Sequence, residues 1–372
     1  MDKLRKINIQ TIKKILQVRG YKVSKKHQSL VNIYYTVGAS IFLILIFYSI
    51  PFINSFSSKI LIKNKIIVNT SNKNFNRVLE GKQIELNQNS ENDNVNYEEL
   101  FIDIFNFDIE EKDTVRLSAS TINQLFKDEN YNLKDIRKNK LVKPINIDLL
   151  PSEIKSIENA KKRKELFIQI ILPLILDENK KIRIERKMLF SILNKNNNSD
   201  DEKNWLKSKF KQYGVVNMDL TTLKVRMDEI PVSLAIAQAA KETGWGTSRF
   251  AQQGNALFGQ WTYDDNGIKP AGSDIGDTHK VMKFKILKAS VRAYQRNLNT
   301  HKSYKKFRKV RAIQRDVYGS LNSLELVRYL DQYAETGEEY TKILKQIIEQ
   351  NKLTDFDDAK ILPSSIREKS IV

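Results

Sequence analysis

The chain of 372 residues contains no cysteine and only three histidines. Without cysteine, thiolate nucleophiles, disulfide bonds and cysteine-based metal sites are excluded. His27, His279 and His301 lie far apart and show no HExxH spacing, so we expect no metal site and no cofactor. We interpret His301, within Asn-Thr-His, as a hydrogen-bonded structural histidine.

Acidic residues are nearly missing from the first 27 positions, which contain nine lysines and arginines but only one acidic residue, Asp2. All charge is then missing from Gln28 to Ser58, and within that gap residues 31–53 are mostly apolar and long enough to cross a bilayer. A basic N-terminal flank holds that end of a membrane segment in the cytoplasm. The pattern predicts a transmembrane signal-anchor at residues 31–53.

Two other interpretations of this segment fit less well. A buried core helix would not lack charge over such a length, and Ser55-Phe-Ser57 is a poor cleavage site for a signal peptide. We therefore expect the anchor to stay attached to the cytoplasmic membrane. The remainder of the chain would then lie outside that membrane, in the periplasm or beyond.

The formal charge of +19 indicates an anionic partner such as nucleic acid, membrane or cell wall. No nucleic-acid-binding motif is present, and a location outside the membrane argues against nucleic acid. We expect the partners to be the cytoplasmic membrane, through residues 31–53, and the cell wall.

Composition and hydrophobic pattern divide the chain further. Residues 54–113 are rich in asparagine and mixed charge, which is typical of a partly disordered stalk. Helical periodicity is expected over Lys162–Lys195, with a kink at Pro173, and again at Ala289–Asn299, Ser323–Ala334 and Tyr340–Asn351. The expected regions are a basic cytoplasmic segment at 1–30, the anchor at 31–53, the stalk at 54–113, a small helical adaptor at 114–145, the main domain at 146–362 and a flexible tail at 363–372.

The stretch from Ile230 to Trp261 gives the clearest indication of a catalytic residue. Pro231 suits the first turn of a helix, and an apolar stripe from Val232 to Ala239 predicts a buried face. Glu242 lies one turn beyond Ala239, just before Gly244, so we expect its carboxyl group to sit half out of water beside Trp245. Desolvation raises a carboxyl pKa, which lets a glutamic acid act as a general acid near neutral pH.

Several motifs in order resemble the peptidoglycan glucosaminidases of glycoside hydrolase family 73, in their Bax-like branch. They cover about the last third of the chain. The matching pieces are Lys241-Glu-Thr-Gly-Trp-Gly-Thr-Ser-Arg-Phe-Ala251, Gly254-Asn-Ala-Leu-Phe-Gly-Gln-Trp261, Ser290-Val-Arg-Ala-Tyr-Gln-Arg-Asn-Leu-Asn-Thr-His301, Tyr304, Tyr333-Ala-Glu-Thr-Gly-Glu-Glu-Tyr340 and Ile347-Ile-Glu-Gln-Asn-Lys-Leu353.

The resemblance implies a mainly α, lysozyme-like helical domain with a small β-hairpin lobe, and it places Glu242 at the general-acid position. We expect the hairpin between Thr262 and Phe284. The wider family ascribes a second carboxylate to a glutamate on this lobe, but no glutamate lies between Glu242 and Glu325. Aspartates are the candidates for that role, or the substrate's own acetamido group could act instead, which leaves the stereochemistry open. The first candidates are Asp274 and Asp277, with Asp264 and Asp265 behind them.

Aromatic and amide side chains around this motif are candidates for sugar binding, because sugars present apolar faces and polar edges. The candidates are Trp245, Asn255, Phe258, Gln260, Trp261 and Tyr294. Of these, we expect Trp245 and Phe258 to be packing residues in the first place. Trp261 and Tyr294 are the better candidates for contact with sugar.

The sequence favours a membrane-anchored hydrolase that cuts peptidoglycan glycan strands at N-acetylglucosamine, an endo-β-N-acetylglucosaminidase. A lytic transglycosylase shares the single acid, but those enzymes carry a Gly-Leu-Met-Gln motif where this chain has Leu257-Phe-Gly-Gln260. A weakly catalytic wall-binding scaffold is the third hypothesis. No activating protein partner can be named from the sequence.

Overall fold

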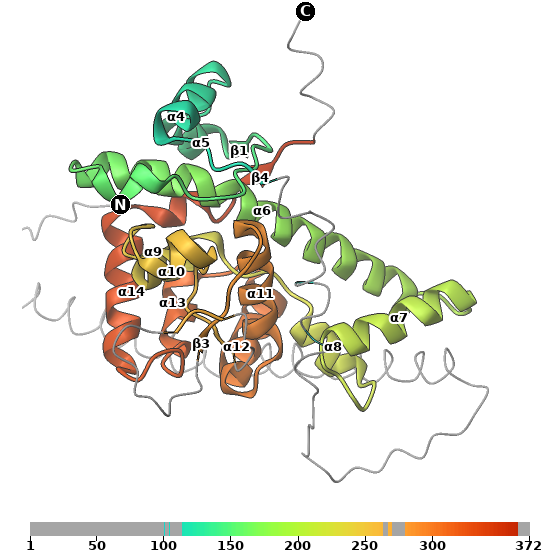
Figure 1. The fold of residues 1–372 in the computed structure, drawn as a ribbon. Helices are drawn as coiled ribbons and strands as arrows, with labels where there is room; N and C mark the ends of the chain where they lie inside the picture. Colours follow the sequence, from blue (N-terminus) through green and yellow to red (C-terminus); the bar gives the residue numbers. More distant parts are fainter. Residues whose placement is uncertain (1–99, 101–103, 105–113, 263–266, 270–279, 364–372) are drawn as a thin grey trace, which may run out of the picture. The chain divides into compact units, whose positions relative to one another are not determined.

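The computed structural model describes residues 114–262, 267–269 and 280–363, together with Leu100 and Ile104 (Figure 1). All of them belong to one compact unit within residues 71–372. The described part is mainly helical, as expected, and none of its helices has the length and apolar character needed to span a bilayer. The expected anchor at residues 31–53 lies outside the described residues.

The described elements follow one another along the chain in this order: α4 (Ala119–Asp128), α5 (Leu133–Asn139), β1 (Leu141–Val142), η2 (Ser152–Ser156), α6 (Ala160–Leu193), α7 (Asp200–Gln212), α8 (Leu220–Arg226), α9 (Val232–Thr243), α10 (Arg249–Gly254), β2 (Trp261–Thr262), β3 (Lys280–Val281), α11 (Leu287–Thr300), η3 (Lys302–Tyr304), α12 (Lys305–Tyr318), α13 (Ser323–Leu326), η4 (Val327–Tyr329), α14 (Glu338–Gln350), η5 (Leu353–Phe356) and β4 (Lys360–Ile361).

Helix α9 is the centre of the fold. It is rich in alanine and packs against α6, α14 and η5, and every residue from Val232 to Ala240 is buried. A helix that is apolar on all sides belongs in a core rather than at a surface, so the expected single stripe understated its burial. Pro231 is the N-cap, one residue before the first helical position, and Gly244 ends the helix at φ 57°.

Helix α6 is the longest element and continues through Pro173. Figure 1 shows the helix changing direction along its length, in agreement with the expected kink. Its first half enters the main core beside α9 and α11, whereas its second half forms a smaller core with α7 and α8. Helix α7 begins at a capping box in which Ser199 and Glu202 each bond the other's backbone N–H.

The region before residue 146 is joined to the end of the described chain. Strand β1 pairs in parallel with β4, with Leu141 opposite Lys360 and Val142 opposite Ile361. Ile122 and Phe126 of α4 share the main core with Phe167 of α6. The boundaries of the expected domains remain predictions.

Two described residues come from the expected stalk. Leu100 and Ile104 are helical and buried, and Ile104 belongs to a small apolar cluster with Met282 and Phe284. Leu100 and Ile104 therefore pack against the helical body.

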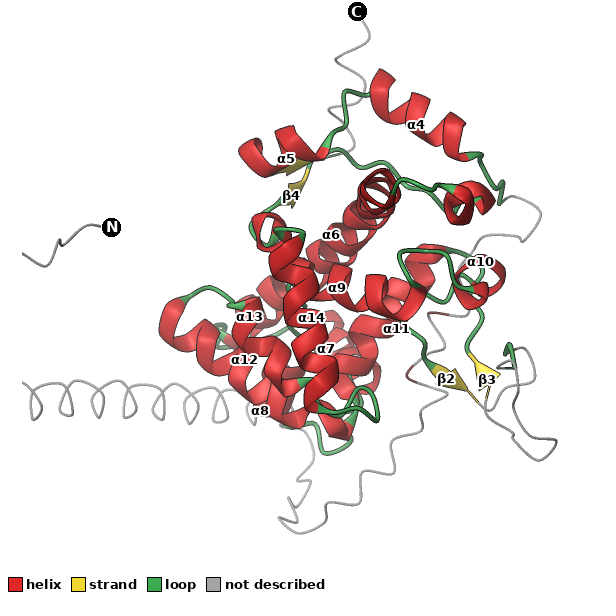
Figure 2. Ribbon diagram, turned by 90° about the vertical axis from the view of Figure 1, so that its left-hand side faces the viewer, coloured by secondary structure: helices red, strands yellow, loops and turns green. Residues whose placement is uncertain are grey.

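The hairpin is present at the expected place, but its described strands are short. Strand β2 pairs antiparallel with β3, placing Trp261 opposite Val281. Figure 2 shows the two strands at the edge of the helical body, near α10 and α11. The helix expected over Ser323–Ala334 is wrong: the chain makes one turn of α13, a 3-10 turn and then irregular backbone. Contacts of this segment with α9, α12 and α14 bury Leu326, Val327 and Leu330 and override the helical periodicity.

Candidate active site

Glu242 lies in the last turn of α9, and its carboxyl group is held by a tyrosine from α14. The Tyr340 hydroxyl donates to Glu242 Oε1 at 2.8 Å. Tyr340 also accepts a hydrogen bond from Gln238 Nε2 at 3.1 Å, one helical turn before Glu242. Because Oε1 is engaged, Oε2 is the carboxyl oxygen left for other chemistry.

The loop after α10 passes directly over the other oxygen. A side chain at Gly259 would place its Cβ 3.2 Å from Glu242 Oε2, and the backbone there has φ +61°. Both the left-handed backbone and the close approach favour glycine at this position. The motif Leu257-Phe-Gly-Gln260 thus fits tightly against the carboxyl group.

Burial raises the pKa of the Glu242 carboxyl above its ordinary value. The hydrogen bond from Tyr340 and the charge of Lys241 act in the opposite direction without cancelling the rise. Glu242 is half-buried, as expected from the sequence. The neutral acid is therefore favoured to a higher pH than for a solvated glutamate.

Three tyrosines surround this helix end. Tyr333 and Tyr340 stack with ring centroids 5.6 Å apart, and Tyr304 lies 5.9 Å from Tyr333. The Tyr333 hydroxyl donates to the carbonyl oxygen of Phe258 at 2.8 Å, which ties the segment before α14 to the loop. Burial raises the pKa of Tyr304 to about 12 and the pKa values of the other two still further, so all three remain neutral donors.

The sequence reasoning gave no role to these tyrosines or to Gln238. Tyr304 and the Tyr333–Tyr340 motif belong to the stretches that resemble the family, and Gln238 lies at i−4 to Glu242 on the same helix. That helical spacing was the available signal for Gln238. The tyrosines reach Glu242 because of how α14 and η3 pack in the fold. The local sequence pattern around each tyrosine does not predict this contact.

Tyr294 and Phe258 do not offer surfaces to a sugar. Both are buried, with 0% and 1% exposure, and their rings stack at 3.9 Å with an interplanar angle of 7°. The Tyr294 hydroxyl donates to Gln238 Oε1 at 2.7 Å. The Tyr294 ring fills the core behind Glu242 in this structure, so its expected contact with sugar stays a prediction, and Phe258 is a packing residue.

Asn255 is also structural. It ends α10 at φ 51°, and its Nδ2 donates to the carbonyl oxygens of Phe284 and Lys285 at 2.9 and 3.1 Å. These bonds tie the loop to the base of the hairpin, whereas Asn255 Oδ1 has no hydrogen-bond partner among the described residues, so the expected role in sugar binding stays a prediction. Trp245 stands edge-on to Phe167 at 5.9 Å, and the Lys164 ammonium lies 4.9 Å from the centre of its ring. These contacts indicate that Trp245 packs against α6 and does not shield Glu242.

Gln260 and Trp261 remain suited to substrate. Gln260 is 9% exposed, and its Oε1 has no hydrogen-bond partner among the described residues. A buried acceptor without a partner is costly, which favours a donor supplied by a ligand. Trp261 on β2 is 59% exposed.

The candidate aspartates Asp264, Asp265, Asp274 and Asp277 lie outside the described residues. His301 is the N-cap of η3, with Nδ1 accepting from the Ser303 N–H at 3.3 Å, as expected of a structural histidine. Within the described ranges, no group of three His, Asp or Glu residues could hold a metal ion.

Comparison with known proteins is consistent with this geometry. Residues 222–353 match the family model Glucosaminidase, described as mannosyl-glycoprotein endo-beta-N-acetylglucosaminidase. The chain is 31% identical over 206 residues to "Protein bax" of Escherichia coli (strain K12), covering 54% of this chain and 74% of that protein. No solved structure matches the chain at a significant level. The matched segment includes α9, the hairpin strands and α14.

Proposed function

Because the chain belongs to the Bax-like glucosaminidase family and is a glycoside hydrolase, we propose that it cleaves peptidoglycan glycan strands at N-acetylglucosamine with Glu242 as general acid. The single observation that carries the proposal is the half-buried Glu242 carboxyl group, held through Oε1 by Tyr340.

The glycosidic oxygen is a poor leaving group until it is protonated, and positive charge develops on the sugar ring as the bond breaks. Oε1 of the neutral acid accepts the Tyr340 hydrogen bond, so the transferable proton resides on Oε2. That oxygen faces Gly259, where the Cβ of any other residue would lie 3.2 Å away and would crowd the carboxyl group. Glu242 then donates the Oε2 proton to the leaving oxygen.

Gln260 and Trp261 follow directly on this loop and would hold the sugar. The unpartnered Gln260 Oε1 suits the N–H of an acetamido group, and the exposed indole of Trp261 suits the apolar face of a sugar ring. These roles agree with a substrate that carries N-acetyl groups.

The second catalytic group is proposed to be Asp274 or Asp277, with the substrate's acetamido group as the alternative. Asp274→Asn and Asp277→Asn would each be assayed against Asp201→Asn, a change at an exposed aspartate on α7. If one aspartate activates water, only its variant should lose most of the turnover. Full activity in both variants would favour the acetamido group. The configuration of the freed sugar, read by NMR at early times, gives the stereochemical outcome.

The central test uses the full chain in detergent micelles with purified wall sacculi. Glu242→Gln should abolish the release of soluble fragments, because the amide cannot supply the proton. Glu165→Gln, an exposed glutamate on α6, is the matched control and should release fragments at the wild-type rate. Undiminished release by Glu242→Gln would refute the proposal.

A lytic transglycosylase is the second candidate, since the contacts of Glu242 within the described ranges come from tyrosine rather than from another carboxylate. Mass spectrometry of the products separates the two enzymes. Reducing N-acetylglucosamine ends support the hydrolase, and anhydromuramic ends support the transglycosylase.

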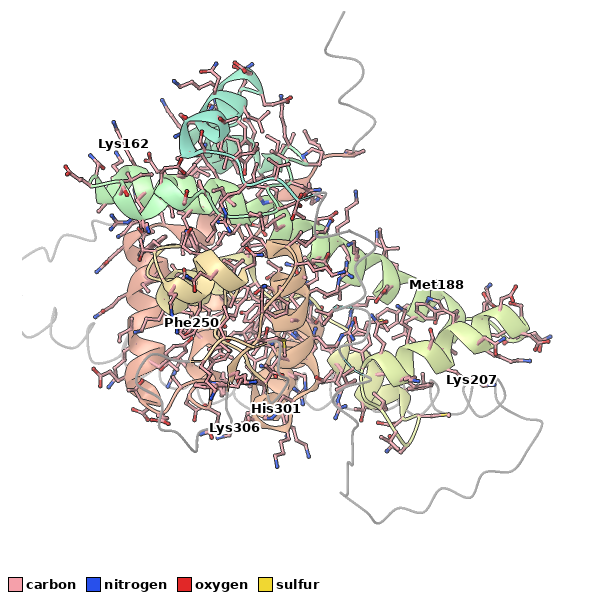
Figure 3. All side chains as sticks on the ribbon, viewed as in Figure 1. Lys162, Met188, Lys207, Phe250, His301 and Lys306 are labelled. Atoms are coloured by element: carbon pink, nitrogen blue, oxygen red, sulfur yellow. The ribbon has the colours of Figure 1, made fainter. Side chains whose placement is uncertain are left out.

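We further propose that residues 31–53 anchor the enzyme in the cytoplasmic membrane with the catalytic domain outside. The surface of the described part is compatible with an anionic wall or membrane: exposed lysines such as Lys162, Lys207 and Lys306 project from α6, α7 and α12 (Figure 3). Protease added outside spheroplasts should digest the catalytic domain and spare a cytosolic marker protein. Protection of the domain until the membrane is lysed would contradict this location.

A further inference from the structure

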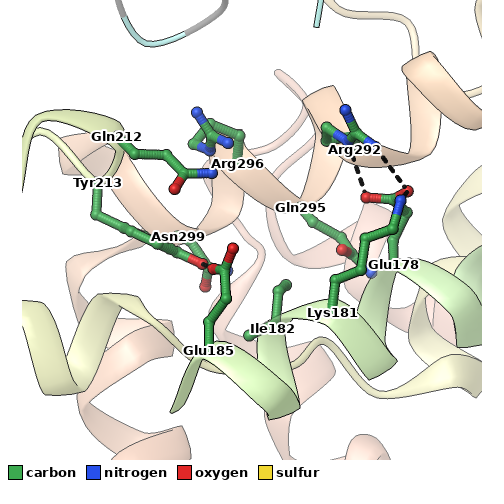
Figure 4. Close-up of a pocket in the computed structure, with 10 residues that line it drawn as sticks. All are labelled: Glu178, Lys181, Ile182, Glu185, Gln212, Tyr213, Arg292, Gln295, Arg296 and Asn299. Atoms are coloured by element: carbon green, nitrogen blue, oxygen red, sulfur yellow. Dashed lines mark hydrogen bonds and ion pairs between the residues drawn. The ribbon is translucent and has the colours of Figure 1, made fainter. Parts of the chain in front are cut away.

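A cavity of about 280 Å³ lies between α6, the C-terminal end of α7 and α11 (Figure 4). Helix α11 separates it from the catalytic residues. Tyr294 on α11 bonds Gln238 of α9, whereas Arg292 and Gln295 on the same helix bond α6 and line the cavity. The cavity is therefore distinct from the site around Glu242.

The acidic groups in the cavity wall already have cationic partners. Glu178 accepts from Arg292 Nε at 2.9 Å and from Lys181 at 2.7 Å. Glu185 accepts from Lys209 at 2.5 Å. Since these carboxylates are compensated, the cavity does not require a cation as its occupant.

Three amide side chains around the same space retain hydrogen-bonding capacity. Asn299 is 1% exposed and donates to the Asp228 carbonyl oxygen at 2.9 Å, but its Oδ1 has no partner among the described residues. Gln295 uses its Nε2 for Asn179, which leaves its carbonyl oxygen, and Gln212 uses its Oε1 for Lys209, which leaves its amide nitrogen. Figure 4 shows Gln212, Gln295 and Asn299 around one cavity.

We propose that this cavity is an accessory binding site for a single N-acetylated sugar residue of a glycan. The Gln295 carbonyl oxygen and the Gln212 amide nitrogen match the N–H and the carbonyl oxygen of an acetamido group. Asn299 Oδ1 is enclosed in the cavity wall, and leaving it unsatisfied costs about 1–3 kcal/mol, so a side-chain rotation that turns it toward a donor on the occupant would be favoured. The volume is just below the range of roughly 300–1,000 Å³ for sites that bind drug-sized ligands, so one sugar ring fits better than several.

The choice of an N-acetylated sugar rests on the proposed function. An accessory site on the far side of α11 would hold a glycan strand while another part of it is cut. Two linked sites would keep the enzyme on the glycan strand between cuts, because binding of the strand at one site raises its effective concentration at the other.

The test uses the full chain in detergent micelles, carrying Glu242→Gln so that no turnover occurs. Chitotriose, the β-1,4 trimer of N-acetylglucosamine, is titrated by calorimetry and by saturation-transfer NMR. Two binding components are expected. Gln212→Trp, which fills the cavity from the end of α7, should weaken one component at least ten-fold and leave the other unchanged.

Two further variants keep this result interpretable. Gln212→Ala removes only the amide and should weaken the same component, which covers the case in which tryptophan disturbs α7. Asn204→Ala removes an exposed amide from the same helix, away from the cavity, and should retain both components. Unchanged binding in both Gln212 variants would overturn the accessory site.

Failure of the accessory site and failure of the proposed function are distinguishable. If wild-type protein leaves sacculi intact but Gln212-dependent binding of chitotriose persists, the accessory site stands alone. If sacculi are cut and no Gln212-dependent binding is found, the accessory site is wrong and the catalytic proposal is unaffected.

Discussion

The hydroxyl of Tyr340 donates to Glu242 Oε1 at 2.8 Å across the packed interface of α14 and α9. The two residues are 98 positions apart, and in the proposed mechanism their pairing leaves Oε2 as the carboxyl oxygen that carries the transferable proton. Burial raises the pKa of Glu242, and this hydrogen bond limits the rise.

Replacing Tyr340 with phenylalanine should therefore move the pH profile of the enzyme. Loss of the hydrogen bond removes an influence that lowers the pKa of Glu242, so that pKa rises further. A general acid is active when protonated, and the rate falls as pH rises through its pKa. The descending limb of kcat against pH should thus shift to higher pH, while the maximal rate drops about ten-fold because the carboxyl group is less well positioned.

The readout is kcat measured on sacculi across pH. Tyr318→Phe, at an exposed position on α12, is the control and should reproduce the wild-type profile. An unshifted limb in Tyr340→Phe would contradict the assignment of Glu242 as the acid.

Glu242→Gln should make the protein more stable at neutral and alkaline pH. A carboxyl group whose pKa is higher in the folded state than in the unfolded state favours folding fully below the unfolded pKa, and that contribution is lost as pH rises through the folded pKa. The neutral amide has no such loss. The Tm advantage of the variant over wild type should grow from pH 4 to pH 8, as measured by calorimetry, and a constant difference would argue against a raised pKa.

Gly259→Ala should impair catalysis beyond its effect on stability. Its backbone has φ +61°, and the new Cβ would lie 3.2 Å from Glu242 Oε2. Gly319→Ala is a matched control, because its φ is +68° but a Cβ there meets nothing within 4 Å. Both changes should cost about 1–2 kcal/mol of folding free energy from the left-handed backbone.

Only Gly259→Ala should also lower kcat, by at least ten-fold when corrected for the folded fraction. Denaturant unfolding and turnover on sacculi give the two quantities. Equal activities in the two alanine variants would show that the space beside Oε2 is not needed.

Trp261 and Tyr294 should respond to mutation in opposite ways. Trp261→Ala removes a 59% exposed indole, so we expect KM to rise several-fold with little change in Tm. Tyr294→Phe leaves Gln238 Oε1 without its buried donor, so the free energy of unfolding should fall by about 1–3 kcal/mol with little change in KM. A raised KM for Tyr294→Phe at unchanged stability would restore Tyr294 as a sugar-contacting residue.

Local pattern was sufficient for much of the fold. Alanine-rich apolar spacing predicted α9, and Gly244 marked its end because glycine adopts the left-handed backbone most easily. The long helix through Pro173, the helix at α11 and the helix at α14 also followed from periodicity. The same reasoning failed at Ser323–Ala334, where contacts with α9, α12 and α14 override the helical periodicity.

The sequence by itself determined the candidate acid, since Glu242 follows an apolar helix and precedes its glycine stop within a family motif. It also placed Gln260 and Trp261 in the same stretch of sequence, Ile230 to Trp261, as that acid. The tertiary structure alone decided which aromatic rings reach the carboxyl group and which fill the core. Tyr340 reaches Glu242 and Tyr294 turns inward because helices distant in the sequence pack side by side, and residue periodicity records which face of a helix is apolar but not which partner covers it.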